Sequence, residues 1–193
     1  MKKRPVKIVL AALLTAVLFS CGNQPKQEDP KDVAEEQNEE KTDDTNLEDD
    51  ADFAVDAADG GMMEVELGRL AATKATSPEV KKFAQMMVDD HSKANDELKA
   101  LAQQKNISLP ASLSEEKQKK LTDFNEKKAE DFDKDYIDFM VEDHEDDIEE
   151  FEEQAKNGKD AELKTWASGK VATLRHHLEM AKSTQEILKN QKK

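Results

Sequence analysis

Apolar residues recur every three, four or seven positions along most of the chain after residue 50. This spacing places them on one face of an α-helix and marks four long amphipathic segments. We expect long helices over about residues 52–76, 78–106, 131–157 and 160–190, and a shorter one over about 112–128. Their apolar stripes contain, in order, Phe53, Ala57, Leu67 and Ala71; Val80, Phe83, Met87, Leu98 and Leu101; Tyr136, Met140, Ile148, Phe151 and Ala155; Leu163, Ala167, Val171, Leu174, Leu178, Ala181 and Leu188.

Residues that favour helix ends separate these segments. Ser77 followed by Pro78 is typical of a helix start, and Ser112 to Glu115 matches a capping box. Gly158 fits the position after a helix end, and Asp160 can cap the last helix. Together they leave turns of only a few residues at two of the three junctions between the long helices.

Four long helices with these junctions predict an all-α fold, a ferritin-like four-helix bundle. The additional short helix falls between the second and third long helices, where ferritin-like bundles have a long crossover connection. Simple up-down-up-down order is the alternative, and the pattern does not decide between the two.

Residues 1–20 have the features of a bacterial secretory signal. Four basic residues precede an apolar run over residues 8–19, which as a helix spans about 18 Å and is too short to cross a bilayer. Leu18-Phe19-Ser20-Cys21 resembles the lipoprotein signal box, which implies that Cys21 is acylated and anchors the protein to a membrane. Gly22 in place of Asp favours outer-membrane delivery, on the periplasmic or the surface face. The alternative is an ordinary signal peptide with an incidental cysteine.

Charge divides the remaining chain. Residues 21–50 contain three Lys but twelve Asp or Glu, and they have too few apolar side chains to form a core. We therefore expect a lipoprotein signal peptide over residues 1–20, a disordered acidic tether over residues 21–50 and the helical bundle over residues 51–193. Removing the signal would change the net charge from −15 to −19, because the signal carries four positive charges.

Composition excludes several classes of function. A chain with 44 Asp and Glu against 29 Lys and Arg repels phosphate backbones, so we expect no nucleic-acid partner. A single Cys cannot form a disulfide framework or a thiolate zinc site. The sequence also lacks a glycine-rich phosphate loop and a serine elbow, which favours a protein that is not an enzyme.

Four polar residues fall on the apolar stripes near the middles of the four long helices. They are Glu64, His91, His144 and His177, one from each helix. Mid-helix positions share one height in a bundle whatever the connection order, so the four side chains can converge. Three imidazoles and a carboxylate suit a Zn, Cu or Fe ion. The alternative is a buried polar network that only specifies the fold.

The residues next to the three histidines indicate which metal chemistry the site suits. Asp90 and Asp143 each precede a histidine by one residue, so we expect them to point about 100° away, into solvent. The acidic run from Asp143 to Glu153 is then a solvated face. No histidine has a Glu three residues before it, which disfavours di-iron chemistry. A Met lies one turn from each, at Met87, Met140 and Met180; thioethers suit Cu(I), although Met more often fills gaps in a core.

The second and third long helices repeat one motif, which reads Met87-Val-Asp-Asp-His91 in one and Met140-Val-Glu-Asp-His144 in the other. Duplication of a helical hairpin is one explanation, and a shared local requirement is the other.

The chain resembles the bacterial envelope family catalogued as "domain of unknown function 4142". The resemblance rests on residues 60–71 and 87–95, Phe132-Asp133 with Tyr136, Asp143-His144, Leu174 and His177-Leu178. It implies a ferritin-like bundle in a secreted or lipid-anchored protein, with Glu64, His91, His144 and His177 as the recurrent polar residues and with no established activity.

These features together predict a lipid-anchored, non-enzymatic envelope protein that binds a metal ion through Glu64, His91, His144 and His177. The alternative is an envelope interaction or stress-protection module whose central residues are structural. A ferritin-type oxidoreductase is a third, weaker possibility.

Overall fold

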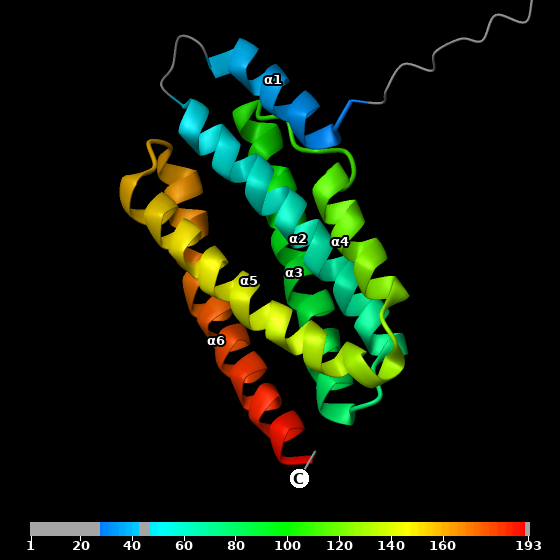
Figure 1. The fold of residues 1–193 in the computed structure, drawn as a ribbon. Helices are drawn as coiled ribbons and strands as arrows, with labels where there is room; N and C mark the ends of the chain where they lie inside the picture. Colours follow the sequence, from blue (N-terminus) through cyan, green and yellow to red (C-terminus); the bar gives the residue numbers. More distant parts are fainter. Residues whose placement is uncertain (1–27, 43–46, 192–193) are drawn as a thin grey trace, which may run out of the picture.

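The computed structural model describes residues 28–42 and 47–191, and within them it contains six helices and no strand (Figure 1). The predicted signal peptide and Cys21 lie outside the described residues. No helix in the described ranges combines the length and hydropathy needed to cross a bilayer. The helices are α1 (Pro30–Thr42), α2 (Glu48–Lys74), α3 (Pro78–Lys105), α4 (Glu115–Glu126), α5 (Ala129–Asn157) and α6 (Ala161–Gln191), which confirms the predicted all-α class.

Two carboxylates show how the long helices run. Asp50, at the start of α2, accepts a hydrogen bond from the backbone N–H of Lys159 in the α5–α6 turn, at 2.9 Å. Asp133, at the start of α5, accepts one from the backbone N–H of Ser77 in the α2–α3 turn, at 2.7 Å. Each antiparallel pair thus begins against the turn of the other pair, and α3 and α5 run in the same direction (Figure 1).

This order requires the chain to travel the length of the bundle between α3 and α5. Residues 106–128 make that crossing, and α4 lies along α2 (Figure 1). The N–H of Ser114 donates to buried Asp59 in the first half of α2, while Lys74 at the end of α2 donates to the carbonyl of Phe124. The connection is therefore a long crossover, as the ferritin-like arrangement requires, and the up-down-up-down alternative does not apply.

The helix ends follow the expected chemistry with two corrections. Ser77 and Asp160 cap α3 and α6 as predicted. Ser114, rather than Ser112, caps α4, because it accepts from the N–H of Lys117. Gly158 ends α5 without a left-handed conformation, its φ being −51°. A Cβ there would lie 2.5 Å from the side chain of Gln154, so close packing explains the glycine.

The expectation of disorder over residues 21–50 is wrong for the part that the structure describes. α1 packs against α2, and the latter already begins at Glu48. The amide of Asn38 both donates to the carbonyl and accepts from the N–H of Ser108, at 2.9 and 2.7 Å. Ala34 and Asn38 are both buried. Hydrogen bonds to a loop 70 residues away, rather than an apolar stripe, dock α1.

The interior has apolar clusters on both sides of a polar layer. One cluster, toward the α2–α3 turn, contains Leu67, Phe83, Met87, Phe132, Tyr136 and Met140. Two smaller clusters, toward the α5–α6 turn, contain Phe53, Phe151 and Leu174, and Ala54, Leu98 and Leu163. The mid-helix polar residues lie between them, with apolar side chains above and below.

Asn38→Ala tests the docking of α1. Loss of both hydrogen bonds to Ser108 should lower the free energy of unfolding by about 1–2 kcal/mol, because the partly buried backbone groups of Ser108 lose their partner. Chemical denaturation measures this change. Glu39→Ala, at the adjacent exposed position, is the control and should change stability little. Equal stability of the two variants would contradict the packing of α1.

Candidate metal centre

The structure brings together the four polar residues that the sequence selected. Glu64 on α2, His91 on α3, His144 on α5 and His177 on α6 are all buried, with exposed fractions between 0% and 7%. Each lies near the middle of its helix, at the level between the apolar clusters. The predicted convergence of one side chain from each long helix is therefore observed.

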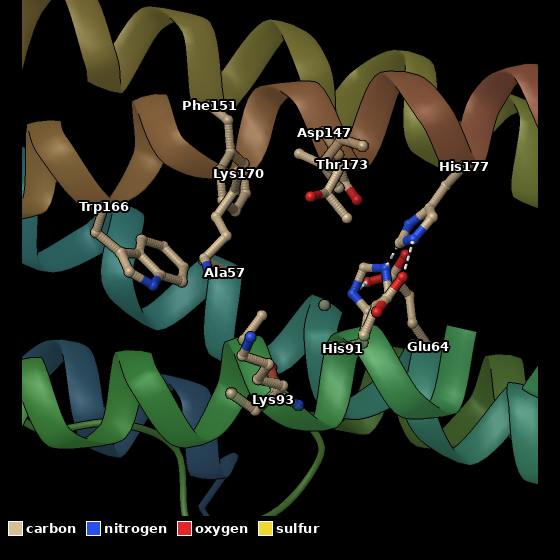
Figure 2. Close-up of a pocket in the computed structure, with 15 residues that line it drawn as sticks. Ala57, Glu64, His91, Lys93, Asp147, Phe151, Trp166, Lys170, Thr173 and His177 are labelled. Atoms are coloured by element: carbon tan, nitrogen blue, oxygen red, sulfur yellow. Dashed lines mark hydrogen bonds and ion pairs between the residues drawn. The ribbon is translucent and has the colours of Figure 1, made fainter. Parts of the chain in front are cut away.

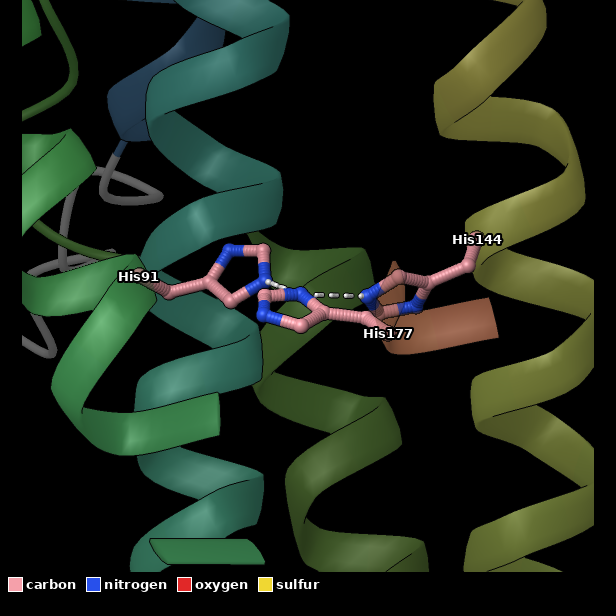
Figure 3. Close-up of side chains that lie close together, drawn as sticks. All are labelled: His91, His144 and His177. Atoms are coloured by element: carbon pink, nitrogen blue, oxygen red, sulfur yellow. Dashed lines mark hydrogen bonds between the residues drawn. The ribbon is translucent and has the colours of Figure 1, made fainter. Parts of the chain in front are cut away.

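Three imidazole nitrogens face one another at the centre of this layer. His177 Nδ1 lies 3.3 Å from His91 Nε2 and 3.4 Å from His144 Nε2. Figure 3 shows the three rings reaching toward a common point from three helices. The three ligand atoms all lie within 4.8 Å of one another. Bonds of 2.0–2.1 Å to a tetrahedral ion place neighbouring nitrogens about 3.3–3.4 Å apart, so this spacing suits one metal ion.

The outer nitrogens of two rings have acidic partners. His91 Nδ1 lies 2.6 Å from Glu64 Oε2, and His177 Nε2 lies 2.9 Å from Asp90 Oδ2. An ionised carboxylate accepts hydrogen bonds, so with both acids ionised the proton of each ring lies on the outer nitrogen. The inner nitrogens of His91 and His177 then carry lone pairs directed at the centre. Carboxylate–histidine pairs orient the ligands of protein metal sites in the same way.

The expectation that Asp90 only faces solvent is wrong, because its carboxylate contacts His177. Its side chain is 45% exposed, yet it contacts buried His177 from α3. The sequence offered only its position before His91 on the same helix. Its partner is on α6, 87 residues away, and only the packing of α3 against α6 reveals it.

Two further carboxylates adjoin the layer. Asp143 and Asp147 on α5 form a second group of candidate ligands with Glu64 and His144, whose ligand atoms lie within 4.8 Å of one another. Both aspartates are partly buried, whereas Glu145 and Asp146 between them are exposed, so only part of the acidic run is the solvated face that the sequence predicts. They precede His144 by one residue and follow it by three, which puts both on the same side of its helical position, about 60–100° away. Their spacing from His144 was the sequence feature that could have indicated that Asp143 and Asp147 lie beside the polar layer.

Burial controls the titration of the centre. It lowers the pKa of His91 to about 4 and, with the neighbouring imidazoles, that of His144 to about 3. The pKa of His177 is also lowered by burial, against the opposing hydrogen bond to Asp90. The imidazoles are therefore neutral at physiological pH, which is the form that binds metal ions.

The carboxylates shift in the opposite direction. Burial raises the pKa of Glu64 well above its usual value, and the charge of Asp143 adds to the shift. Burial also raises the pKa of Asp143 to about 6 and that of Asp147 well above its usual value. A metal ion at the centre would supply a positive charge that stabilises the ionised forms of these three acids.

A cavity of about 120 Å³ opens beside the layer (Figure 2). Glu64, His91 and His177 lie at one end, and Asp147 borders the same space. Trp166 and Phe151 line the far end. A cavity of this size admits several water molecules or a hydrated ion but no large substrate.

The repeated motif has a structural explanation. His91 lies in the second helix of the first hairpin, whereas His144 lies in the first helix of the second. Duplication of a hairpin would place the copies in corresponding helices, so the repeat reflects a shared local requirement. α3 and α5 run in the same direction and bring the two histidines to one level.

A sequence model described as "Domain of unknown function (DUF4142)" matches residues 34–184. The chain belongs to this family. The match confirms the resemblance and includes most of α1 as well as the four long helices. No curated protein and no solved structure gives a significant match to the chain.

Asp143→Asn tests the electrostatics of the metal-free centre. Between about pH 4 and 6, folded Asp143 keeps a proton that the unfolded chain has lost, so its contribution to stability falls as pH rises. The variant lacks this loss and should gain about 1–2 kcal/mol over the parent across that range. Denaturation of chelator-treated protein at several pH values measures the difference. Exposed Glu142→Gln is the control; a difference between D143N and the parent that stays constant with pH would contradict the assignment.

Proposed function

We propose that this protein binds a transition-metal ion at mid-bundle through His91, His144, His177 and Glu64. The observation that carries the proposal is the meeting of three neutral imidazoles through their inner nitrogens, at 3.3 and 3.4 Å. A neutral imidazole has one unprotonated nitrogen that can bind a metal ion, and the spacing of the inner nitrogens suits one ion held by all three rings. Glu64 Oε1, 3.5 Å from His144 Nε2, can supply the fourth ligand.

The donor set favours Zn²⁺ among the candidates Zn, Cu and Fe. Three nitrogens and one carboxylate oxygen match a tetrahedral zinc site. The thioethers of Met87 and Met140 pack in the apolar cluster toward the α2–α3 turn, which leaves a Cu(I) site with thioether ligands without support. An Fe²⁺ ion can bind the same nitrogens and is therefore included in the test below.

We infer a role in holding the ion rather than in catalysis. The centre is buried between apolar clusters, and the adjoining cavity is too small for a large substrate. The alternative function, an envelope interaction or stress-protection module, requires the four residues to act only as a polar network. Such a network leaves the buried Oε1 of Glu64 without a hydrogen-bond partner, which favours the metal.

The sequence of residues 1–21 supports a place in the bacterial envelope. A basic start, a short apolar run and Cys21 at the end of the signal box suit a lipid anchor, and Gly22 in place of Asp favours the outer membrane. The membrane is then the partner that the anchor implies, and no nucleic acid is expected.

His144→Ala tests metal binding. The parent, purified without chelator or loaded with Zn²⁺, should bind zinc with the three-histidine site, and H144A should lose at least about tenfold in affinity. Elemental analysis and calorimetric titration measure this. Exposed His176→Ala, beside His177, is the matched control and should bind like the parent. Absence of stoichiometric metal in the parent, with a melting temperature unchanged by Zn²⁺, Cu²⁺ or Fe²⁺, would overturn the proposal.

Cys21→Ser tests the anchor. The parent expressed in a Gram-negative host should incorporate labelled fatty acid and sediment with membranes, since two or more acyl chains give stable binding. C21S should incorporate no label and remain in the supernatant after cell disruption. Equal labelling of both forms would rule out acylation at this residue.

A further inference from the structure

We propose a second divalent-cation site beside the three histidines, formed by Asp143 and Asp147 with Glu64. Its ligands are carboxylate oxygens, so it would take an ion of the Mn²⁺ or Fe²⁺ class rather than one that prefers nitrogen or sulfur. The inference rests on the proposed function, because Glu64 would contribute to both sites and make the centre dinuclear.

The geometry supplies a ligand set that does not depend on the rings of His91 and His177. One ligand atom each from Glu64, Asp143, His144 and Asp147 lies within 4.8 Å of the others. Three of these residues come from α5, where spacings of one and three residues place them on neighbouring sides of the helix. The fourth, Glu64, reaches them from α2, so the site exists only where these two helices pack.

An unpartnered oxygen points to a missing ligand. Glu64 is 2% exposed, and its Oε2 is used by His91, but its Oε1 has no hydrogen-bond partner. Oε1 lies 3.5 Å from His144 Nε2, too far for a good hydrogen bond. Leaving a buried carboxylate oxygen unsatisfied costs free energy. Because Oε2 is held by His91, Oε1 is the oxygen left to bind metal, and it would bridge the ion at the three histidines and an ion beside the aspartates.

The hydroxyl of Tyr136 is a second unsatisfied group nearby. Its ring is fully buried on α5, two turns before His144, and the hydroxyl has no hydrogen-bond partner among the described residues. Burial raises the pKa of Tyr136, and the charges of Glu64 and Asp143 add to the shift. A water molecule on the bound ion would give this hydroxyl a partner.

No basic side chain neutralises the acids directly. Within the described ranges, neither Asp143 nor Asp147 forms an ion pair with Lys or Arg, and Lys117 on α4 acts on them only through its longer-range field. Three carboxylates held this close repel one another when ionised. A divalent ion reverses that repulsion, and the cavity of about 120 Å³ bordered by Asp147 has room for its water ligands.

The two sites can be filled separately. Zn²⁺ binds nitrogen ligands more tightly than Mn²⁺ does, so one equivalent of Zn²⁺ should occupy the three-histidine site first. Mn²⁺ added to the zinc-loaded chain should then enter the carboxylate site. Electron paramagnetic resonance follows the free Mn²⁺ signal, which falls as the ion binds. We expect one Mn²⁺ per chain.

Asp143→Asn/Asp147→Asn removes two of the carboxylate ligands. The variant should keep its equivalent of Zn²⁺, which shows that it is folded, and should bind Mn²⁺ at least about tenfold more weakly. Glu142→Gln/Asp146→Asn, at exposed positions of the same helix, changes the net charge equally and should bind Mn²⁺ like the parent.

The outcomes separate the two proposals. Zinc binding without Mn²⁺ binding, or equal Mn²⁺ binding by the parent and D143N/D147N, overturns the second site and leaves the proposed function intact. Failure of the parent to bind Zn²⁺ overturns both. Equal loss of Mn²⁺ binding in the two double variants would show a nonspecific charge effect and would also overturn the second site.

Discussion

The whole structure depends on burying ionisable groups in the middle of an apolar bundle. Glu64, His91 and His144 are buried between clusters of aromatic and aliphatic side chains. Such burial is costly unless the polar groups satisfy one another or hold an ion. The layer therefore tolerates little axial displacement, because contacts of 3.3 and 3.4 Å between rings on different helices are lost when one helix slides.

Several contacts fix the positions of the helices relative to one another along the bundle axis. Asp50 and Asp133, at the starts of α2 and α5, each bind backbone N–H groups in the turn of the opposite helical hairpin. Gly68 lets α2 approach α3 closely, since a Cβ there would lie 2.8 Å from Val88. The crossover, held at both ends to α2, fixes α5 parallel to α3. These contacts lie at the two ends of the bundle and along one helix pair, and together they determine the height at which the central side chains meet.

Sequence reasoning succeeded where a requirement repeats along one helix. Apolar spacing located the four long helices, and mid-helix position selected Glu64, His91, His144 and His177, because each can be read from its own segment. It failed for contacts between segments. Asp90 was expected in solvent but accepts from His177, and Asp143 was expected in solvent but adjoins Glu64. Helix α1 escaped notice because Asn38, rather than an apolar stripe, attaches it.

The sequence by itself determined the four long helices, their buried faces and the four polar residues at mid-bundle, since local periodicity and burial preference require no knowledge of neighbours. The tertiary structure decided the crossover order, the docking of α1 and the grouping of aspartates around the histidines. The physical reason is that a helical pattern gives the direction in which a side chain leaves its own axis but not which helix stands opposite. Packing of α2 against α5, and of α3 against α6, supplied those partners.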